Sequence, residues 1–298
     1  MPVPLPEDAT AFDAAADHER GDGVHEVAPD IAYLRLAIVN VAFLGPAGAG
    51  DRGWVLVDAG LPGTKGMITR AAEARFGAGA RPAAILLTHG HFDHVGVLVD
   101  LAEEWDVPVF AHALEHPYLD GTAAYPPPDP GVGGGLMSTL SPLFPRDPVR
   151  LGTRLRALGA NGGMPVLPAW RWVFTPGHSV GHVSFWREAD RAMISGDAFI
   201  TTRQESAYAA MTQSPEMHGP PAYFTVDWEA SRESVRRLAA LEPELVVAGH
   251  GRAMRGAGMR AALHRLAKDF DRLARPEAGT YLDRPARAED GTAYRPPG

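Results

Sequence analysis

The sequence predicts an α/β fold, and three observations lead to that class. β-rich runs separated by short turns fill residues 31–58. An apolar strand at 83–87, a helical pattern over 94–105 and a short strand at 107–110 then give the strand–helix–strand order of α/β proteins. The composition of the 298-residue chain, 45% hydrophobic and 21% charged, is that of a globular protein large enough for one sizeable domain.

The N-terminal part is expected to form an arm followed by three strands. Residues 1–28 are rich in Ala, Asp, Glu and Gly and are interpreted as an N-terminal arm, which leaves a single domain over 29–298. Apolar residues in partial alternation predict strands at 31–36 and 39–44, and a buried strand at 54–57 follows a Gly-rich turn.

Later elements follow from helical spacing and from apolar runs that end at glycine. Thr64 and Asp227 are the expected N-caps of the first and third helices, because a side-chain oxygen at that position can accept from a free backbone N–H. We expect helices at 64–76, 94–105, 228–241 and 257–273, and further strands at 83–87, 107–110, 170–174, 183–186, 192–195 and 245–248.

Residues 117–168 interrupt this pattern with a Pro/Gly-rich insertion. The segment holds YPPPDP at 125–130 and GVGGG at 131–135. A long irregular segment inside a compact domain is usually functional or disordered. Two interpretations stay open: a wall or lid over a functional site, or a passive surface loop.

The most informative motif is THGHFDH at residues 88–94, which directly follows the apolar strand. Imidazole nitrogen and carboxylate oxygen are ligands that zinc and similar divalent metals prefer. His89 and His91 leave an extended chain on the same side, and Asp93 and His94 follow where the chain turns into a helix. One loop therefore offers two pairs of ligands, which indicates two adjacent metal ions.

Three further strand ends carry ligand residues, namely His178, Asp197 and His250. In each case an apolar strand stops and a glycine precedes the ligand, which allows the backbone to approach closely. One strand-terminal His or Asp is usually an ordinary turn residue. Three of them beside the 88–94 motif favour a shared metal site.

With TPGHSVGH at 175–182, SGD at 195–197 and AGHG at 248–251, the sequence resembles the metallo-β-lactamase superfamily of metallohydrolases from about Val55 to His250. The resemblance implies an αββα four-layer sandwich with metal ions at one edge of the sheets. It implies that His89, His91 and His178 hold the first ion, that Asp93, His94 and His250 hold the second, and that Asp197 bridges them.

Zinc is the expected occupant of both positions, and manganese or iron would also suit this His/Asp set. The resemblance also implies that Asp58 and His182 support the ligands without binding metal themselves. Asp93 is further expected to assist proton transfer. No catalytic Ser or Cys is required, because two metal ions can activate a shared water.

The expected activity is hydrolysis of an ester, thioester or lactone of a small molecule by a bridging hydroxide. The chain has no cysteine, which excludes β-lactamase subgroups with a Cys ligand and leaves all-His/Asp types open. Ile200 stands where one lactonase subgroup has Tyr, and Arg203 and Arg252 match the glutathione-gripping residues of glyoxalase II poorly. A mononuclear iron sulfur dioxygenase and an amide-cleaving β-lactamase remain the alternatives.

Charge and composition limit the partners. The net charge is −8, and no run is rich in Lys or Arg, so nucleic-acid binding is not indicated. The acidic, Pro-broken start lacks a signal-peptide pattern and no apolar run is long enough for a membrane span, so we expect a cytoplasmic protein without membrane association. The sequence does not predict the oligomeric state.

Overall fold

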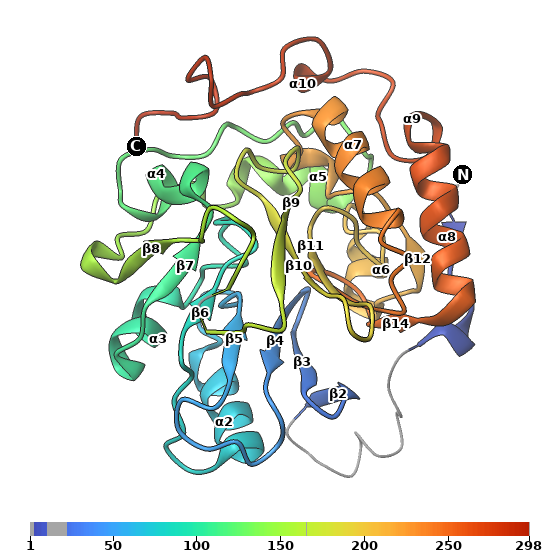
Figure 1. Ribbon diagram of the computed structural model, residues 1–298. Coiled ribbons are helices and arrows are strands. Elements are labelled where there is room, and N and C mark those ends of the chain that lie inside the picture. The colour runs from blue at the N-terminus through green and yellow to red at the C-terminus, as the bar shows by residue number, and fades with distance from the viewer. Residues whose placement is uncertain (1–2, 11–22, 165, 298) are drawn as a thin grey trace.

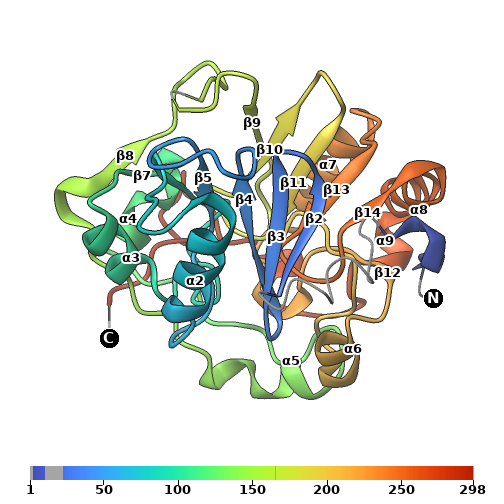
Figure 2. The same ribbon diagram turned by 90° about the horizontal axis from the view of Figure 1, so that it is seen from below.

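The computed structural model describes residues 3–10, 23–164 and 166–297 of the chain. Two β-sheets pack face to face, and helices cover the outer face of each sheet (Figures 1 and 2). Helices α2 (Lys65–Phe76) and α3 (Leu98–Trp105) lie on the larger sheet, and α7 (Trp228–Ala239) and α8 (Gly256–Lys268) lie on the smaller one. The layers therefore follow the order helix, sheet, sheet, helix.

The larger sheet has the strand order β2-β3-β4-β5-β6-β7-β8. Its strands are β2 (Val24–Ala28), β3 (Ile31–Leu36), β4 (Val39–Leu44), β5 (Val55–Val57), β6 (Ile85–Leu86), β7 (Val109–Ala111) and β8 (Leu155–Ala157). Pairing is antiparallel from β2 to β5 and parallel from β5 to β8. Because β5 and β6 are parallel, the residues that follow them emerge at the same edge of the sheet.

The smaller sheet has the order β14-β13-β11-β10-β9. Its strands are β9 (Arg171–Phe174), β10 (Val183–Arg187), β11 (Ala192–Gly196), β13 (Leu245–Ala248) and β14 (Met254–Arg255). Its one parallel pair in the described chain, β11 with β13, again brings two strand ends together. A separate pair joins β1 (Val3–Pro4) to β12 (Glu216–Met217).

Shorter helices lie in the connections between these elements. They are η1 (Glu7–Ala9), η2 (Ala113–Glu115), α4 (His116–Leu119), α5 (Leu136–Leu140), η3 (Ser141–Leu143), η4 (Gly152–Arg154), α6 (Ala207–Thr212), η5 (Ala222–Phe224), α9 (Phe270–Leu273) and α10 (Thr280–Asp283), where η marks a 3-10 helix. The longest helix among the described residues, α8, has 13 residues. No helix in the described ranges combines the length and apolar character needed to traverse a bilayer.

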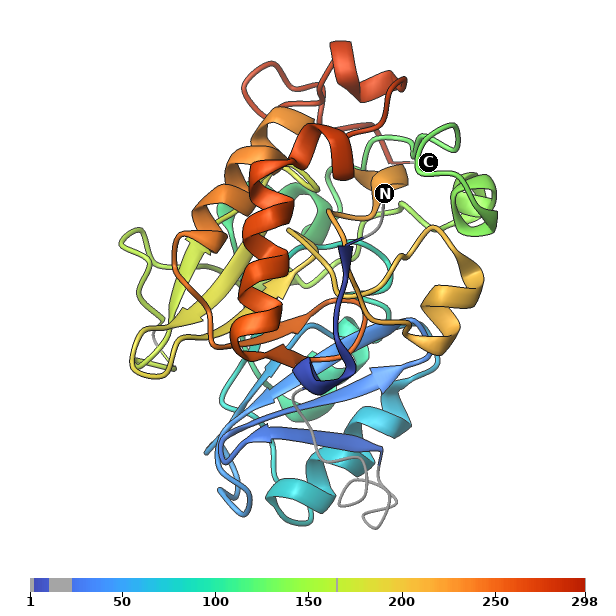
Figure 3. The ribbon, with the colours of Figure 1, turned by 90° about the vertical axis from the view of Figure 1, so that its right-hand side faces the viewer.

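Each of the three layer contacts has its own apolar core. Between the sheets, Phe185 and Ile194 face Leu44. Under α2 and α3, the rings of Trp54 and Phe76 stack with centroids 4.4 Å apart. Residues of α7, α8 and the smaller sheet form the third core. Figure 3 shows these two helices against that sheet, seen from the side of α8. These buried apolar surfaces hold the sheets in register, and with them the loops at the sheet edge.

The N-terminal segment differs from the expected arm. Residues 24–28 form β2 at the edge of the larger sheet, and Val3 and Leu5 are buried against the core of the smaller one. Because β2 pairs with β3 through its backbone, a polar composition did not prevent strand formation. Residues 11–22 of the expected arm lie outside the described residues.

The insertion at 117–168 is less irregular than its composition indicates. It contains α5, η3 and η4, and β8 joins the larger sheet in parallel with β7. β8 has a half-buried residue followed by two exposed ones, so it lacks the apolar run that marks a buried strand. The C-terminal helix also differs, because it ends at Lys268 and a short helix, Phe270–Leu273, follows.

Candidate metal centre

The seven predicted ligand residues come together at one edge of both sheets. The loop after β6 carries His89, His91, Asp93 and His94, and the loop between β9 and β10 carries His178. Asp197 follows β11 and His250 follows β13, the two parallel strands of the smaller sheet. All seven side chains are buried, and the most exposed residue, Asp93, is 7% exposed.

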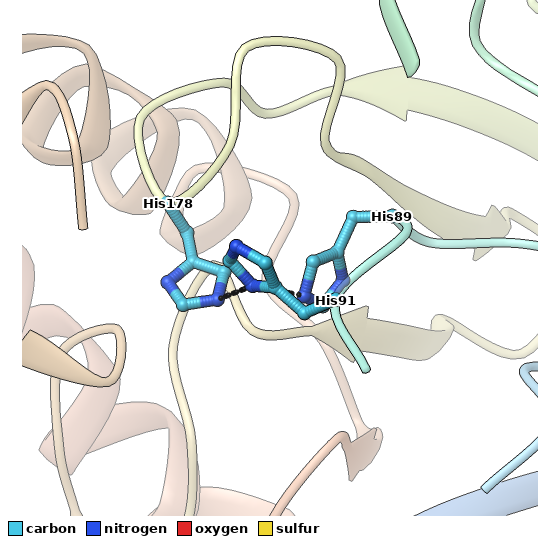
Figure 4. A group of neighbouring side chains, drawn as sticks. All are labelled: His89, His91 and His178. Carbon is cyan, nitrogen blue, oxygen red and sulfur yellow. Dashed lines mark hydrogen bonds between the residues drawn. The ribbon is translucent and has the colours of Figure 1, made fainter. Parts of the chain in front are cut away.

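Three imidazoles form the first group. Nδ1 of His91 lies 3.0 Å from Nε2 of His89 and 2.9 Å from Nε2 of His178. In Figure 4 the three rings point toward one another from two loops that are far apart in the sequence. Three ring nitrogens this close can share a single cation.

A second group lies beside it and contains Asp93, His94 and His250. Nε2 of His250 is 3.6 Å from Oδ2 of Asp93. Asp197 stands between the groups, because its Oδ2 is 3.1 Å from Nε2 of His250 and 3.4 Å from Nε2 of His178.

Hydrogen bonds fix the tautomers of His89 and His94. The Thr88 hydroxyl donates its one proton to Oδ2 of Asp58 (2.8 Å), so it accepts from Nδ1–H of His89 at 3.1 Å. Nδ1–H of His94 donates to the same Asp58 oxygen at 2.8 Å. In both rings the other nitrogen, Nε2, therefore presents a lone pair to the site in the neutral form.

His178 and His250 are oriented in the same way. The Thr225 hydroxyl donates to the Pro221 carbonyl (2.8 Å), which leaves its oxygen to accept from Nδ1–H of His178 at 3.3 Å. Nδ1–H of His250 donates to the carbonyl of Ile38 at 2.6 Å. Four rings thus direct Nε2 lone pairs into the same small volume.

The two predicted supporting residues contact the ligands from outside this volume. Asp58 receives the Thr88 backbone N–H at 2.8 Å in addition to its bonds with the Thr88 hydroxyl and His94. Nε2 of His182 accepts the backbone N–H of Asp197 at 2.9 Å, and its Nδ1 contacts the Thr175 hydroxyl at 2.9 Å. Both nitrogens of His182 are therefore used, and none is left for a metal.

The side chains fit a pair of divalent cations. Nε2 of His94 and Oδ1 of Asp197 are buried and have no hydrogen-bond partner among the described residues. Buried polar atoms are nearly always paired, so two unpaired atoms on ligand side chains indicate that a ligand completes their contacts. The donors are nitrogen and oxygen throughout, a set that zinc, manganese and iron accept.

The charges around the site favour neutral imidazoles in the first group. Burial lowers the pKa of His89 and His91 well below the usual value, and the neighbouring imidazoles add to the effect. Burial also lowers the pKa of His178, to about 4. Neutral imidazole is the form that binds metal, so these three residues need no deprotonation at neutral pH.

The second group is different because carboxylates surround it. Burial acts to lower the pKa of His94 and of His250, but Asp197 and the other nearby carboxylates outweigh it and raise both. Burial likewise acts to raise the pKa of Asp197, and the charges of His250 and His94 outweigh it and hold that pKa well below the usual value. Without metal, protons on His94 and His250 balance the Asp197 charge, and metal binding would displace them.

Comparison with known proteins agrees with this arrangement. Residues 34–250 match the metallo-beta-lactamase superfamily. The chain belongs to this superfamily. The probable metallo-hydrolase YflN of Bacillus subtilis is 43% identical over 258 residues, which cover 87% of this chain and 95% of YflN.

Two more distant superfamily relatives are informative. A hydroxyacylglutathione hydrolase of Acidiphilium cryptum is 29% identical over 234 residues, which cover 76% of this chain and 75% of that protein. A crystal structure described as a di-iron-bound form is 27% identical, has a TM-score of 0.50 and covers 79% of this chain and 96% of that one. The expected α/β sandwich of the metallo-β-lactamase type is thereby confirmed.

Aromatic side chains enclose the site, and two of them come from the insertion. The ring centroids of Tyr125 and Phe224 lie 4.3 Å and 4.8 Å from that of His91. Phe144, also in the insertion, contacts Phe92 with a centroid separation of 5.4 Å. The insertion therefore forms part of the wall of the site, which is one of the two interpretations left open by its sequence.

Sequence reasoning missed several side chains that contact the ligands or their loops, among them Thr88, Glu115, Tyr125 and Thr225. Only Thr88 adjoins a ligand in the sequence.

Proposed function

We propose that the chain is a dinuclear metal-dependent hydrolase that cleaves an ester, thioester or lactone of a small molecule. The observation that carries this proposal is the convergence of four tautomer-fixed imidazoles on Asp197, with buried atoms that lack partners. Such a donor set has no evident structural role without cations. Membership of a superfamily whose relatives include probable metallo-hydrolases supports the same activity.

The proposed ligand assignment follows the two groups. His89, His91 and His178 would hold the first ion, Asp93, His94 and His250 would hold the second, and Asp197 would bind both. The distances from Asp197 to members of each group support the bridging role. Zinc is the proposed metal, and the di-iron relative makes iron the main competitor.

Two bound cations would lower the pKa of a shared water to about 7, so that hydroxide is available at neutral pH for attack on a carbonyl carbon. Side chains around the proposed ions would handle the proton and exclude water. Asp93 is the most exposed of the proposed ligands, so we assign its carboxylate the role of proton acceptor in the reaction. Phe92, Phe144 and Phe224 would exclude water around the reacting carbonyl.

Similarity to a known hydrolase and the side chains around the site both bear on which bond is cleaved. The hydroxyacylglutathione hydrolase similarity supports a thioester, and the apolar rings near His91 suit an acyl group of any of the three bond types. A small molecule fits a site whose ligands are this deeply buried.

The test compares the purified wild type with His89→Ala and with His264→Ala, whose ring is about half exposed and pairs with Glu242 outside the site. Metal content and hydrolysis of p-nitrophenyl esters, a lactone, S-lactoylglutathione and nitrocefin would be measured. We expect two metal ions per wild-type chain, and loss of metal and activity together in His89→Ala only. One iron per chain with no hydrolysis, or a fully active metal-free His89→Ala, would contradict the proposal.

A further inference from the structure

A further buried carboxylate, Glu115, lies beside the proposed metal centre and belongs to neither ligand group. The residue is 0% exposed and sits at the end of η2. Its oxygens accept from the Gly90 N–H at 3.0 Å, the Gly181 N–H at 2.8 Å and the Ser179 hydroxyl at 2.8 Å. The Tyr125 hydroxyl is a fourth donor.

Three of these donors, on Gly90, Ser179 and Gly181, come from the two loops that supply the first group of imidazoles. Gly90 lies between His89 and His91, and Ser179 directly follows His178. Glu115 therefore links the His91 loop to the His178 loop by hydrogen bonds. A carboxylate is suited to this link because it accepts several N–H and O–H groups at once.

Two glycines in the motifs are explained by this contact. A Cβ atom at Gly181 would lie 2.7 Å from Cγ of Glu115 and 2.8 Å from its Oε1. A Cβ atom at Gly90 would lie 2.8 Å from the Tyr125 hydroxyl oxygen. All three distances are shorter than van der Waals contact, so the loops can approach Glu115 and Tyr125 only without side chains at these positions.

Tyr125 also contacts His91, one of the proposed metal ligands. Its ring lies against that of His91, and its hydroxyl oxygen also accepts the Gly90 N–H at 2.8 Å. The ring also stacks on Tyr118, with centroids 3.7 Å apart. His91 is thus held between the Glu115 network and a fixed aromatic ring.

We propose that Glu115 and Tyr125 are positioning residues that set the geometry and affinity of the first metal site. The inference rests on the proposed function in one respect, that the three imidazoles bind a metal. Burying a carboxylate among neutral donors is costly, and here its four hydrogen bonds serve to hold the two ligand loops at a fixed separation.

The test measures metal binding in Glu115→Gln, Tyr125→Phe and Glu205→Gln. In Glu115→Gln an amide N–H₂ would face a backbone or hydroxyl donor, so at least one bond is lost. Tyr125→Phe keeps the ring against His91 and removes only the hydroxyl. Glu205 is equally buried; its Oε1 accepts the Ala222 N–H and its Oε2 lies 3.5 Å from Nε2 of His218, so Glu205→Gln controls for loss of a different buried carboxylate.

Zinc affinity would be measured by competition with a chromophoric chelator, and the absorption spectrum of the cobalt-substituted protein would report ligand geometry. We expect Glu115→Gln to weaken one of two zinc sites by about 10–100-fold, the usual effect of removing a group that orients a ligand. Its cobalt bands should shift. Tyr125→Phe should change the zinc affinity and the cobalt spectrum in the same direction but by less. Glu205→Gln should change neither the affinity nor the spectrum.

Wild-type affinity and an unchanged cobalt spectrum in Glu115→Gln would overturn the proposal, as would an equal loss in Glu205→Gln. If Glu115→Gln does not fold, Tyr125→Phe decides, and wild-type values there would also overturn it. A wild-type protein that binds two metals but hydrolyses none of the test substrates, with Glu115→Gln weakened, would refute the proposed hydrolase and support the positioning role.

Discussion

At the scale of single residues, Asp58 shows how one carboxylate can orient several ligands. It fixes the proton of His94 directly and that of His89 through the Thr88 hydroxyl. It has a left-handed backbone conformation (φ 62°), in which a non-glycine residue is uncommon. Such a position at the end of β5 points to a side chain retained for its contacts rather than for local backbone preference.

Replacing this carboxylate by an amide should weaken the second metal site. In Asp58→Asn the amide N–H₂ would face either the Nδ1–H of His94 or the Thr88 backbone N–H, so one donor loses its acceptor. We expect metal affinity at the site that includes His94 to fall by about 10–100-fold. Activity should recover at high zinc concentration, and a zinc titration of the hydrolysis rate would show this. An unchanged zinc dependence would contradict the orienting role.

The ligand residues were predictable from the sequence, whereas most of the residues that orient them were not. The loop at 88–94 was recognisable because four ligand residues fall within six positions after an apolar strand. Glu115, Tyr125 and Thr225 were not, because each contacts its ligand loop only in the folded chain and none stands in a ligand pattern. Residues that orient ligands are therefore found from contacts rather than from motifs.

At the scale of elements, long amphipathic segments were predictable and short edge strands were not. The helix expected at 228–241 is α7, because a strong apolar stripe and Asp227 both mark it. The strand expected at 83–87 is reduced to Ile85–Leu86, and β8 and β14 were not expected at all. Short strands at a sheet edge, such as β8 and β14, form because the neighbouring strand offers its backbone, which leaves little trace in their own sequence.

The N-cap of α7 gives a test at this scale. The Asp227 carboxylate accepts the Ala230 N–H at 3.0 Å. Asp227→Ala removes that acceptor and should lower the free energy of unfolding by about 1 kcal/mol, whereas Asp227→Asn retains a capping oxygen and should stay close to wild type. Chemical denaturation followed by circular dichroism would measure both. Equal stability of the two variants would show that the cap contributes little here.

At the scale of the whole molecule, the metal centre joins two halves of the fold. The larger sheet supplies the loop with His89 and the supporting Asp58, and the smaller sheet supplies His178, Asp197 and His250. A cation that contacts both sets would bind the folded protein and not the unfolded chain. Bound metal should therefore raise the stability of the whole domain and not of one loop alone.

This coupling predicts opposite pH trends for the metal-free and metal-loaded proteins. Burial holds the pKa of His178 at about 4 and that of His182 at about 3, so below about pH 6.5 the unfolded chain binds more protons and stability falls. Although burial opposes it, Asp197 raises the pKa of His94 and His250. The stability that protonated His94 and His250 contribute is present below about pH 6.5. It is lost as the pH rises through their raised pKa values.

The metal-free protein should therefore be most stable near pH 6.5, the usual pKa of histidine, and lose stability on either side. Metal replaces the protons on His94 and His250, so the loaded protein should keep its stability at higher pH, and the difference between the two forms should widen from pH 6.5 to pH 8.5. Thermal unfolding with zinc and with chelator across this range measures both curves. A metal-free protein that becomes steadily more stable above pH 6.5 would show that Asp197 does not retain those protons, and the charge balance inferred for the empty ligand set would be wrong.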